Sequence, residues 1–226
     1  MPLAADPSTT AVRVWDLPTR LFHWALAASV IGSVVSAKIG GNAMPWHFRF
    51  GYVVLTLLAF RLLWGFAGGR WSRFSSFAYG PTALWRYLRG TPRPGEHFDV
   101  GHSPLGALSV FAMLVALAAQ LGTGLIADDE IANVGPLNRH VAVDTGLAAT
   151  AYHKSVGQAL VLTLVLLHVA AVLVYLLRRH NLIAPMIHGD KPLPPLVPGS
   201  ADTLATRLFA AVLLAGCAVV VRHLVA

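Results

Sequence analysis

Hydrophobic residues gather in five long runs along the chain, separated by segments rich in charged residues, glycine and proline. The runs lie at about residues 19–38, 47–67, 104–127, 153–177 and 203–225. Each has close to the roughly 20 residues that a helix needs to cross about 30 Å of hydrocarbon. The pattern predicts an all-α integral membrane protein: a four-helix transmembrane bundle followed, after a proline-rich linker, by one extra C-terminal transmembrane helix.

The composition agrees with a chain embedded in a lipid bilayer. Of the 226 residues, 56% are hydrophobic and 12% are charged, whereas about 25% of residues are charged in soluble domains. This excludes a disordered tail and argues against a soluble domain. The single cysteine, Cys217, excludes an internal disulfide, a paired-thiolate zinc site and a C-x-x-C-H haem attachment.

Basic residues are divided unequally between the two sides of the predicted bundle. Most lysines and arginines fall on the side of the N-terminus, the 68–103 loop and the linker after Tyr175. By the positive-inside rule, the N-terminus is cytoplasmic and the C-terminus periplasmic. Topology therefore explains the net charge of +7. Nucleic acid is not an expected partner, because no element shows a basic stripe interleaved with stacking aromatic residues.

Four of the ten histidines lie within or at the edges of the predicted spans: His23 in the first, His47 in the second, and His153 and His168 in the fourth. Ionisable residues at membrane depth are rare and mark functional sites. His153 and His168 are separated by about 22 Å of helix and lie within about 60° of each other in azimuth. Because successive spans alternate in direction, His47 is level with His153 near the periplasmic face. His23 is level with His168 near the cytoplasmic face.

Two histidines at each level suit a b-type haem better than a bare metal ion. Zinc and copper sites usually need three or four ligands, and no Cys, Asp or Glu lies near either level within the spans. A b-type haem needs only two axial nitrogens, since the macrocycle supplies the other four. We therefore predict two bis-histidine haems b per chain, with His23, His47, His153 and His168 as iron ligands.

Glycines next to two of these histidines are candidate contacts for the macrocycle. Gly51 follows His47 by four residues and Gly157 follows His153 by four, so each lies on the face of its histidine and leaves room for a porphyrin plane. The alternative for each histidine is a polar contact between helices, and for each glycine it is close packing. Close packing alone is expected for two further glycines, Gly122 and Gly124, because the third span holds no histidine.

Two arginines are candidate partners for haem propionates at the cytoplasmic level. Arg61 follows His47 by about 21 Å of helix on nearly the same face. Arg20 lies one turn before His23. A guanidinium pairs well with a carboxylate, which would explain an arginine between Phe60 and Leu62 inside a span.

Several motifs, in order, make the chain resemble the bacterial cytochrome b561 family, particularly its branch of nickel-iron hydrogenase-type cytochrome b subunits. They are Val14-Trp15-Asp16-Leu17-Pro18-Thr19-Arg20-Leu21-Phe22-His23-Trp24; Trp46-His47 with Gly51-Tyr52; Phe60-Arg61 with Trp64-Gly65; Gly101-His102-Ser103-Pro104-Leu105-Gly106; and His153 and His168-Val169 followed by Asn181-Leu182, Met186 and Gly189. Together they cover roughly residues 12 to 191.

The resemblance implies a diheme cytochrome of the bacterial inner membrane, with four core helices and ligands at His23, His47, His153 and His168. It also implies respiratory electron exchange with quinone, or with a partner such as a periplasmic cytochrome c or a redox enzyme subunit. A quinone site near His102 rests on this resemblance alone. Two features depart from the family: the spacing from His153 to His168 is one residue longer than expected, and a fifth span follows the linker.

These observations predict a cytochrome b561-like diheme membrane domain at residues 1–191, and a proline-rich linker with an additional helix at 192–226. The expected function is transmembrane electron transfer between the quinone pool and a periplasmic redox partner. One alternative is a cytochrome b subunit that anchors a hydrogenase or another periplasmic redox enzyme. Another is a histidine-lined transporter of a divalent metal or of protons, and a third is a structural membrane protein without a cofactor.

Overall fold

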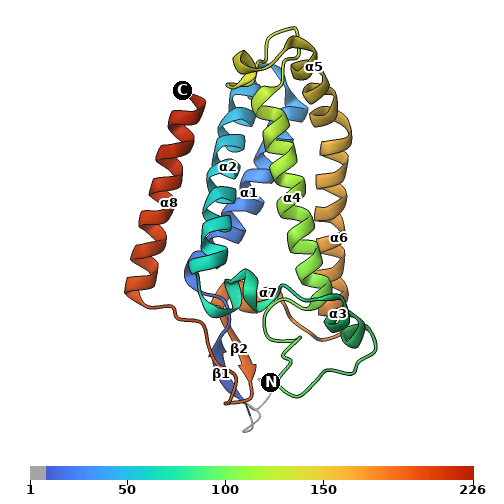
Figure 1. The fold of residues 1–226 in the computed structure, drawn as a ribbon, viewed down its shortest axis with the longest axis vertical. Coiled ribbons are helices and arrows are strands. Elements are labelled where there is room, and N and C mark those ends of the chain that lie inside the picture. Colours follow the sequence, from blue (N-terminus) through green and yellow to red (C-terminus); the bar gives the residue numbers. More distant parts are fainter. Residues whose placement is uncertain (1–8) are drawn as a thin grey trace. The chain divides into compact units, whose positions relative to one another are not determined.

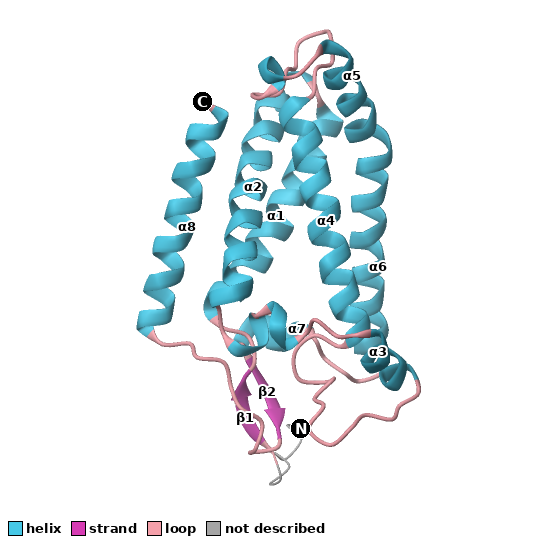
Figure 2. Ribbon diagram, in the orientation of Figure 1, coloured by secondary structure: helices cyan, strands magenta, loops and turns pink. Residues whose placement is uncertain are grey.

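The computed structural model describes residues 9–226, and about 70% of the chain is helical. Within the described residues, five helical segments are long and apolar enough to cross a membrane (Figures 1 and 2). They are Leu17–Ile39, Gly41–Ala67, Pro104–Ile126, Val143–Leu177 and Leu204–Val225. The five predicted spans are confirmed. Residues 1–8 of the predicted 1–191 domain lie outside the described residues.

The long helices are joined by short elements that the hydropathy pattern did not predict. Apart from short 3-10 helices, the elements in chain order are β1 (Thr10–Arg13), α1 (Leu17–Ile39), α2 (Met44–Ala67), α3 (Pro81–Leu88), α4 (Pro104–Ile126), α5 (Val143–Tyr152), a π turn (His153–Gly157), α6 (Gln158–Leu177), α7 (Ile183–His188), β2 (Asp190–Leu193) and α8 (Leu204–Val225). The fourth span was expected to begin near residue 153. In the structure, this span begins earlier, with α5, which runs without interruption into the π turn.

The chain folds as two compact units, and residues from α1, α2, α4, α6 and α8 occur in both. Unit 1 contains the described residues up to Leu21, together with Leu62–Ser109 and Ala171–Ala210. Unit 2 contains Phe22–Arg61, Val110–Ala170 and Ala211–Ala226. All four span histidines belong to unit 2.

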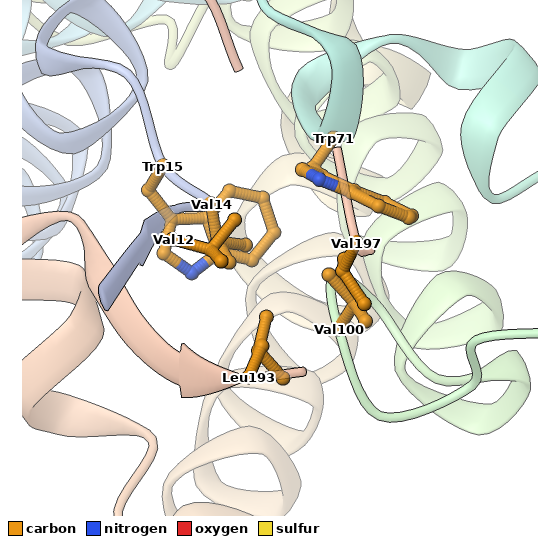
Figure 3. Packing of buried hydrophobic residues seen from close by; sticks show 7 residues of the cluster. All are labelled: Val12, Val14, Trp15, Trp71, Val100, Leu193 and Val197. Atoms are coloured by element: carbon orange, nitrogen blue, oxygen red, sulfur yellow. The ribbon is translucent and has the colours of Figure 1, made fainter. Parts of the chain in front are cut away.

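The core of unit 1 forms around a small antiparallel sheet, in which Thr10 of β1 faces Leu193 of β2 and Arg13 faces Asp190. Burial of apolar side chains stabilises such a unit by about 1.5–3 kcal/mol per large side chain. The proline-rich segment after β2 contributes Val197 to this core. A domain boundary at residue 191 stays a prediction. The buried residues of the core are Val12, Val14, Trp15, Trp71, Val100, Leu193 and Val197 (Figure 3).

Asp16 organises the start of α1 in unit 1. Its side chain is 0% exposed, and Oδ1 caps the helix by accepting the backbone N–H of Thr19 at 2.8 Å. The same oxygen accepts Trp64 Nε1 at 3.3 Å. Oδ2 accepts the Gly69 N–H at 3.0 Å and the Ser72 hydroxyl at 2.9 Å. One carboxylate thus ties the start of α1 to the end of α2 and the segment that follows it.

Asp202 is a second buried carboxylate of unit 1, with a side chain that is 6% exposed. It lies 3.0 Å from Arg13 Nη1 and 2.9 Å from Arg207 Nε, and Arg20 Nη2 is 3.9 Å away. The hydrogen bond from Arg207 is the main cause that lowers the pKa of Asp202. The ion pair with Arg13 holds the segment before α8 against β1.

We expect Asp202→Asn to lower the free energy of unfolding at pH 7 and to reduce the loss of stability in acid. Because the folded-state pKa is lowered, the ionised carboxylate stabilises the fold above the ordinary aspartate pKa of 3.8. That stabilisation is lost as the pH falls through the lowered folded-state pKa. Thermal unfolding in detergent from pH 7 down to pH values below the ordinary pKa measures the effect.

The exposed Asp144 in the first turn of α5 provides the control, Asp144→Asn, for which a smaller difference is expected. A destabilisation by Asp202→Asn that is equally large when the carboxylate is protonated would contradict the ion-pair account.

Candidate functional site

The structure brings the four span histidines together in two pairs, both within unit 2. The ring centroids of His47, in α2, and His153, in the π turn, are 5.9 Å apart. Those of His23, in α1, and His168, in α6, are 6.3 Å apart. Bonds from imidazole nitrogens to first-row metals such as zinc are about 2.0–2.1 Å long. At these separations, both rings of a pair could hold the same metal ion through one nitrogen each.

The two rings of the His47–His153 level are held in the same way, each by a backbone carbonyl of a neighbouring helix. His47 Nδ1 donates to the Ser33 carbonyl at 2.9 Å, with the Ser33 hydroxyl 3.1 Å away. His153 Nδ1 donates to the Gln120 carbonyl at 2.8 Å. A neutral imidazole that donates through Nδ1 keeps Nε2 as its electron-pair donor. Both rings therefore present the nitrogen that can bind a metal.

A cavity of about 540 Å³ in unit 2 is lined by both histidines of this level. Its volume lies within the roughly 300–1,000 Å³ of ligand and cofactor pockets. Gly51 also lines it, and a Cβ at Gly51 would meet no atom of the described residues within 4 Å. The open space that the sequence predicts beside Gly51 is therefore present, and a macrocycle between the two rings fits the residues that surround it.

Gly157 has different neighbours from those that the sequence suggested. A Cβ at Gly157 would lie 2.1 Å from Gln120 Oε1 and 2.7 Å from Tyr152 Cε1. The missing side chain therefore makes room for Gln120. Gly124 in α4 makes room for a histidine, since a Cβ there would lie 2.8 Å from His153 Cε1. Its packing role was predicted, but its histidine partner was not, because that histidine comes from another helix.

We expect Gly124→Ala to displace the His153 ring. If His153 holds one of two haems, as the sequence predicts, the haem content of the purified protein should fall by up to half. Gly122→Ala is the matched control, because a Cβ at Gly122 would meet no atom of the described residues within 4 Å. Haem quantified per chain and a reduced-minus-oxidised absorption spectrum measure both variants. Equal haem contents in the two alanine variants would show that Gly124 does not position the ring.

The His23–His168 level is built differently. His23 Nδ1 is buried and has no hydrogen-bond partner among the described residues, whereas both rings of the other level have one. Arg61, also in unit 2, is only 4% exposed. A buried guanidinium needs an anionic or hydrogen-bonding environment, which suits the proposed propionate partner. Arg20 belongs to unit 1, where it donates to the Ile187 carbonyl and lies near Asp202.

The π turn places His153 at an irregular point of the fourth span. π turns usually occur as single turns inside α-helices, frequently at functional sites. Such a turn holds more residues than an α-turn, so the rotation from His153 to His168 is smaller than over the same number of residues in a regular helix. The expected difference in spacing from the family pattern stays a prediction.

Two residues of the site were missed by the sequence analysis, Ser33 and Gln120. The polarity of Gln120 could have identified it from the sequence. It is a long polar side chain in a third span without charged residues, where polar groups are costly. Within residues 9–226, no group of three or more His, Cys, Asp or Glu side chains could hold a metal ion. The described part of the chain thus offers paired histidines rather than a complete ligand set for a bare ion.

Comparison with known proteins identifies the family. The family model described as prokaryotic cytochrome b561 matches residues 14–189. The probable Ni/Fe-hydrogenase B-type cytochrome subunit of Azotobacter vinelandii is 28% identical over 134 residues, covering 47% of this chain and 54% of the relative. The probable Ni/Fe-hydrogenase 1 B-type cytochrome subunit of Escherichia coli K12 is 23% identical over 141 residues, with coverages of 49% and 57%.

The chain spans about half the length of these two curated relatives. The probable Ni/Fe-hydrogenase B-type cytochrome subunit of Bradyrhizobium diazoefficiens matches more fully. It is 24% identical over 241 residues, which cover 84% of this chain and 92% of the relative. No solved structure matches the chain significantly. With a family match over most of its length and five helices able to span a membrane, the chain belongs to the prokaryotic cytochrome b561 family of membrane-embedded, electron-carrying b-type cytochromes.

Proposed function

We propose that this chain is a transmembrane diheme b-type cytochrome that carries electrons between the quinone pool and a periplasmic redox partner. The observation that carries the proposal is the presence of two facing histidine pairs at separate levels of unit 2, with centroid separations of 5.9 and 6.3 Å. His47 and His153 ligate one haem iron, and His23 and His168 ligate the other. The distance along the helix from His153 to His168, about 22 Å for a regular helix, separates the two levels.

The protein supplies the ligands, the surroundings and the exclusion of water. Bound haem would supply one-electron redox chemistry, and two histidine ligands for each iron would leave no position free for oxygen. Gly51 leaves room for a macrocycle at the His47–His153 level. Arg61, in the same unit as the His23–His168 level, pairs with a propionate there. A propionate contact for Arg20 stays the sequence-based expectation, since in the structure Arg20 contacts Ile187 and Asp202 of unit 1.

The N-terminus faces the cytoplasm of a bacterial inner membrane. The excess of Lys and Arg on the side of the N-terminus and of the 68–103 loop supports this orientation through the positive-inside rule. The His47–His153 level then lies near the periplasm and the His23–His168 level near the cytoplasm. Electrons cross most of the bilayer within unit 2 between a cytoplasmic-side site and a periplasmic partner.

The partner is a second part of the proposal. The names of the relatives, each a probable B-type cytochrome subunit of a Ni/Fe-hydrogenase, favour a redox enzyme that this chain anchors to the membrane. A periplasmic cytochrome c is the other candidate partner. The candidate quinone site is near His102 and rests on the family resemblance. In unit 1, the ring of His102 is 4.8 Å from that of Trp15 and 4.4 Å from that of Phe77, measured between centroids.

The test begins with the full-length protein purified in detergent. We expect a reduced-minus-oxidised spectrum of b type and two haems per chain, and reduction of both haems by a water-soluble quinol. A colourless protein that binds divalent metal would replace the proposal with the transporter alternative. Two haems that a quinol does not reduce would remove the quinone part and leave the diheme carrier. Unchanged quinol reduction in His102→Leu would move the quinone site elsewhere.

A further inference from the structure

Gln120, in α4, holds His153 through two hydrogen bonds. Its backbone carbonyl accepts His153 Nδ1 at 2.8 Å. Its side-chain Nε2 donates to the backbone carbonyl of His153 at 3.0 Å. Both residues belong to unit 2, and they are 33 positions apart in the sequence. One residue thus fixes both the ring and the main chain of a histidine that the proposed function makes an iron ligand.

The side chain of Gln120 is costly at this position. It stands in a span without charged residues, where an amide without hydrogen-bond partners is costly to bury. Its Oε1 is buried and accepts no hydrogen bond from the described residues. Among the described residues, only the donor half of the amide has a hydrogen-bond partner, and that partner is His153. We therefore attribute to Gln120 a role in positioning His153 rather than in stability alone.

The local backbone is shaped to admit this side chain. The carbonyl that Gln120 binds is that of the first residue of the π turn, His153–Gly157, where the regular α-helical ladder is interrupted. At the other end of the turn, Gly157 has no side chain, and a Cβ there would lie 2.1 Å from Gln120 Oε1. The π turn and the glycine together make the space that Gln120 occupies.

This arrangement distinguishes the two levels. At the other level, His23 Nδ1 has no hydrogen-bond partner among the described residues. A hydrogen bond from the second imidazole nitrogen to a carbonyl fixes the ring and makes it a stronger electron donor to its metal. Stronger donation stabilises ferric over ferrous iron, and hydrogen bonding around the ligands is one of the means by which proteins set haem potentials.

We propose that Gln120 is a positioning residue for the haem held by His47 and His153, and that it lowers the reduction potential of that haem below that of the haem held by His23 and His168. The proposal rests on the proposed diheme function. Gln120 does not touch the iron and acts through His153, by keeping the Nδ1 hydrogen bond short and the ring in one orientation.

The test is Gln120→Leu in the full-length, haem-loaded protein. Leucine has a similar size, lacks the amide donor and leaves the backbone carbonyl in place. We expect both haems to be retained, one of the two midpoint potentials to rise in a spectroelectrochemical titration, and the electron paramagnetic resonance signal of one ferric haem to change. The affected haem must be the one that disappears in His153→Ala. The control is Gly122→Ala in the same helix, for which both potentials should stay unchanged.

Unchanged potentials and resonance signals in Gln120→Leu would overturn the proposal, and so would a shift confined to the haem that survives in His153→Ala. If Gln120→Leu does not fold, Gly157→Ala is the second variant, because it keeps the amide but pushes it away from its position. The same rise is expected there, and no change in a variant that retains its haems would equally overturn the proposal. Failure of the diheme function itself is seen separately, as a wild-type protein without two haems.

Discussion

Replacing one histidine of each pair is expected to remove one haem and spare the other. In His153→Ala, the His47–His153 level loses one of its two proposed ligands while the His23–His168 level keeps both. In His168→Ala the reverse holds. Because the levels are separated by about 22 Å of helix and share no histidine, each variant should retain about half of the wild-type haem. Haem quantified per chain and the reduced-minus-oxidised spectrum give the result.

The same experiment includes its control and a combined variant. His97, which is exposed and outside the spans, can be replaced by alanine with no expected loss of haem. The double variant His153→Ala with His168→Ala should be colourless. Loss of both haems in each single variant would contradict independent levels and would indicate one site that needs all four histidines.

Asp16→Ala is expected to cause the largest loss of stability among substitutions outside the spans. Four donors point at a carboxylate that is 0% exposed: the Thr19 and Gly69 amides, Trp64 Nε1 and the Ser72 hydroxyl. Hydrogen bonds to charged groups contribute about 1.5–3 kcal/mol each, and an unsatisfied buried donor costs about 1–3 kcal/mol. We expect a decrease of about 3 kcal/mol or more in the free energy of unfolding.

Unfolding in mixed detergent, followed by tryptophan fluorescence, measures this decrease. Trp64 reports on the site directly, because its indole N–H is one of the four donors. Asp16→Asn keeps the size of the side chain but places an amide group where two donors approach, so an intermediate loss is expected. A variant no less stable than Asp144→Ala, an exposed position at the start of α5, would show that Asp16 does not organise unit 1.

The sequence was sufficient to predict the spans and the pairing of the histidines by depth. Both depend on regular quantities, namely the length of an apolar helix and the rise and rotation per residue. Irregularity limited the prediction at His153, where a π turn changes the rotation in a way that the residue pattern does not reveal. The ligand roles of the histidines, and the two haems, stay predictions that the variants above test.

Contacts between helices were not predictable in the same way. Whether Ser33, Gln120 or Gly124 faces a histidine depends on how each helix is rotated about its axis, and a helix that is apolar on all sides gives no such information. Unit 1 was missed for another reason. Its strands have four residues each, too few for an alternating pattern to be distinctive, and their partners are far apart in the sequence.

The pairing of β1 with β2 also sets an order of events during synthesis. Arg13 contacts Asp190 across 177 residues of sequence, so the first strand is made long before its partner. At about 5–20 residues per second, β1 waits roughly 10–35 s on the ribosome-bound chain. Four spans are translated within that interval. The sheet therefore closes unit 1 only after the segments carrying all four histidines have been made, which leaves their helices time to enter the bilayer before β1 and β2 pair.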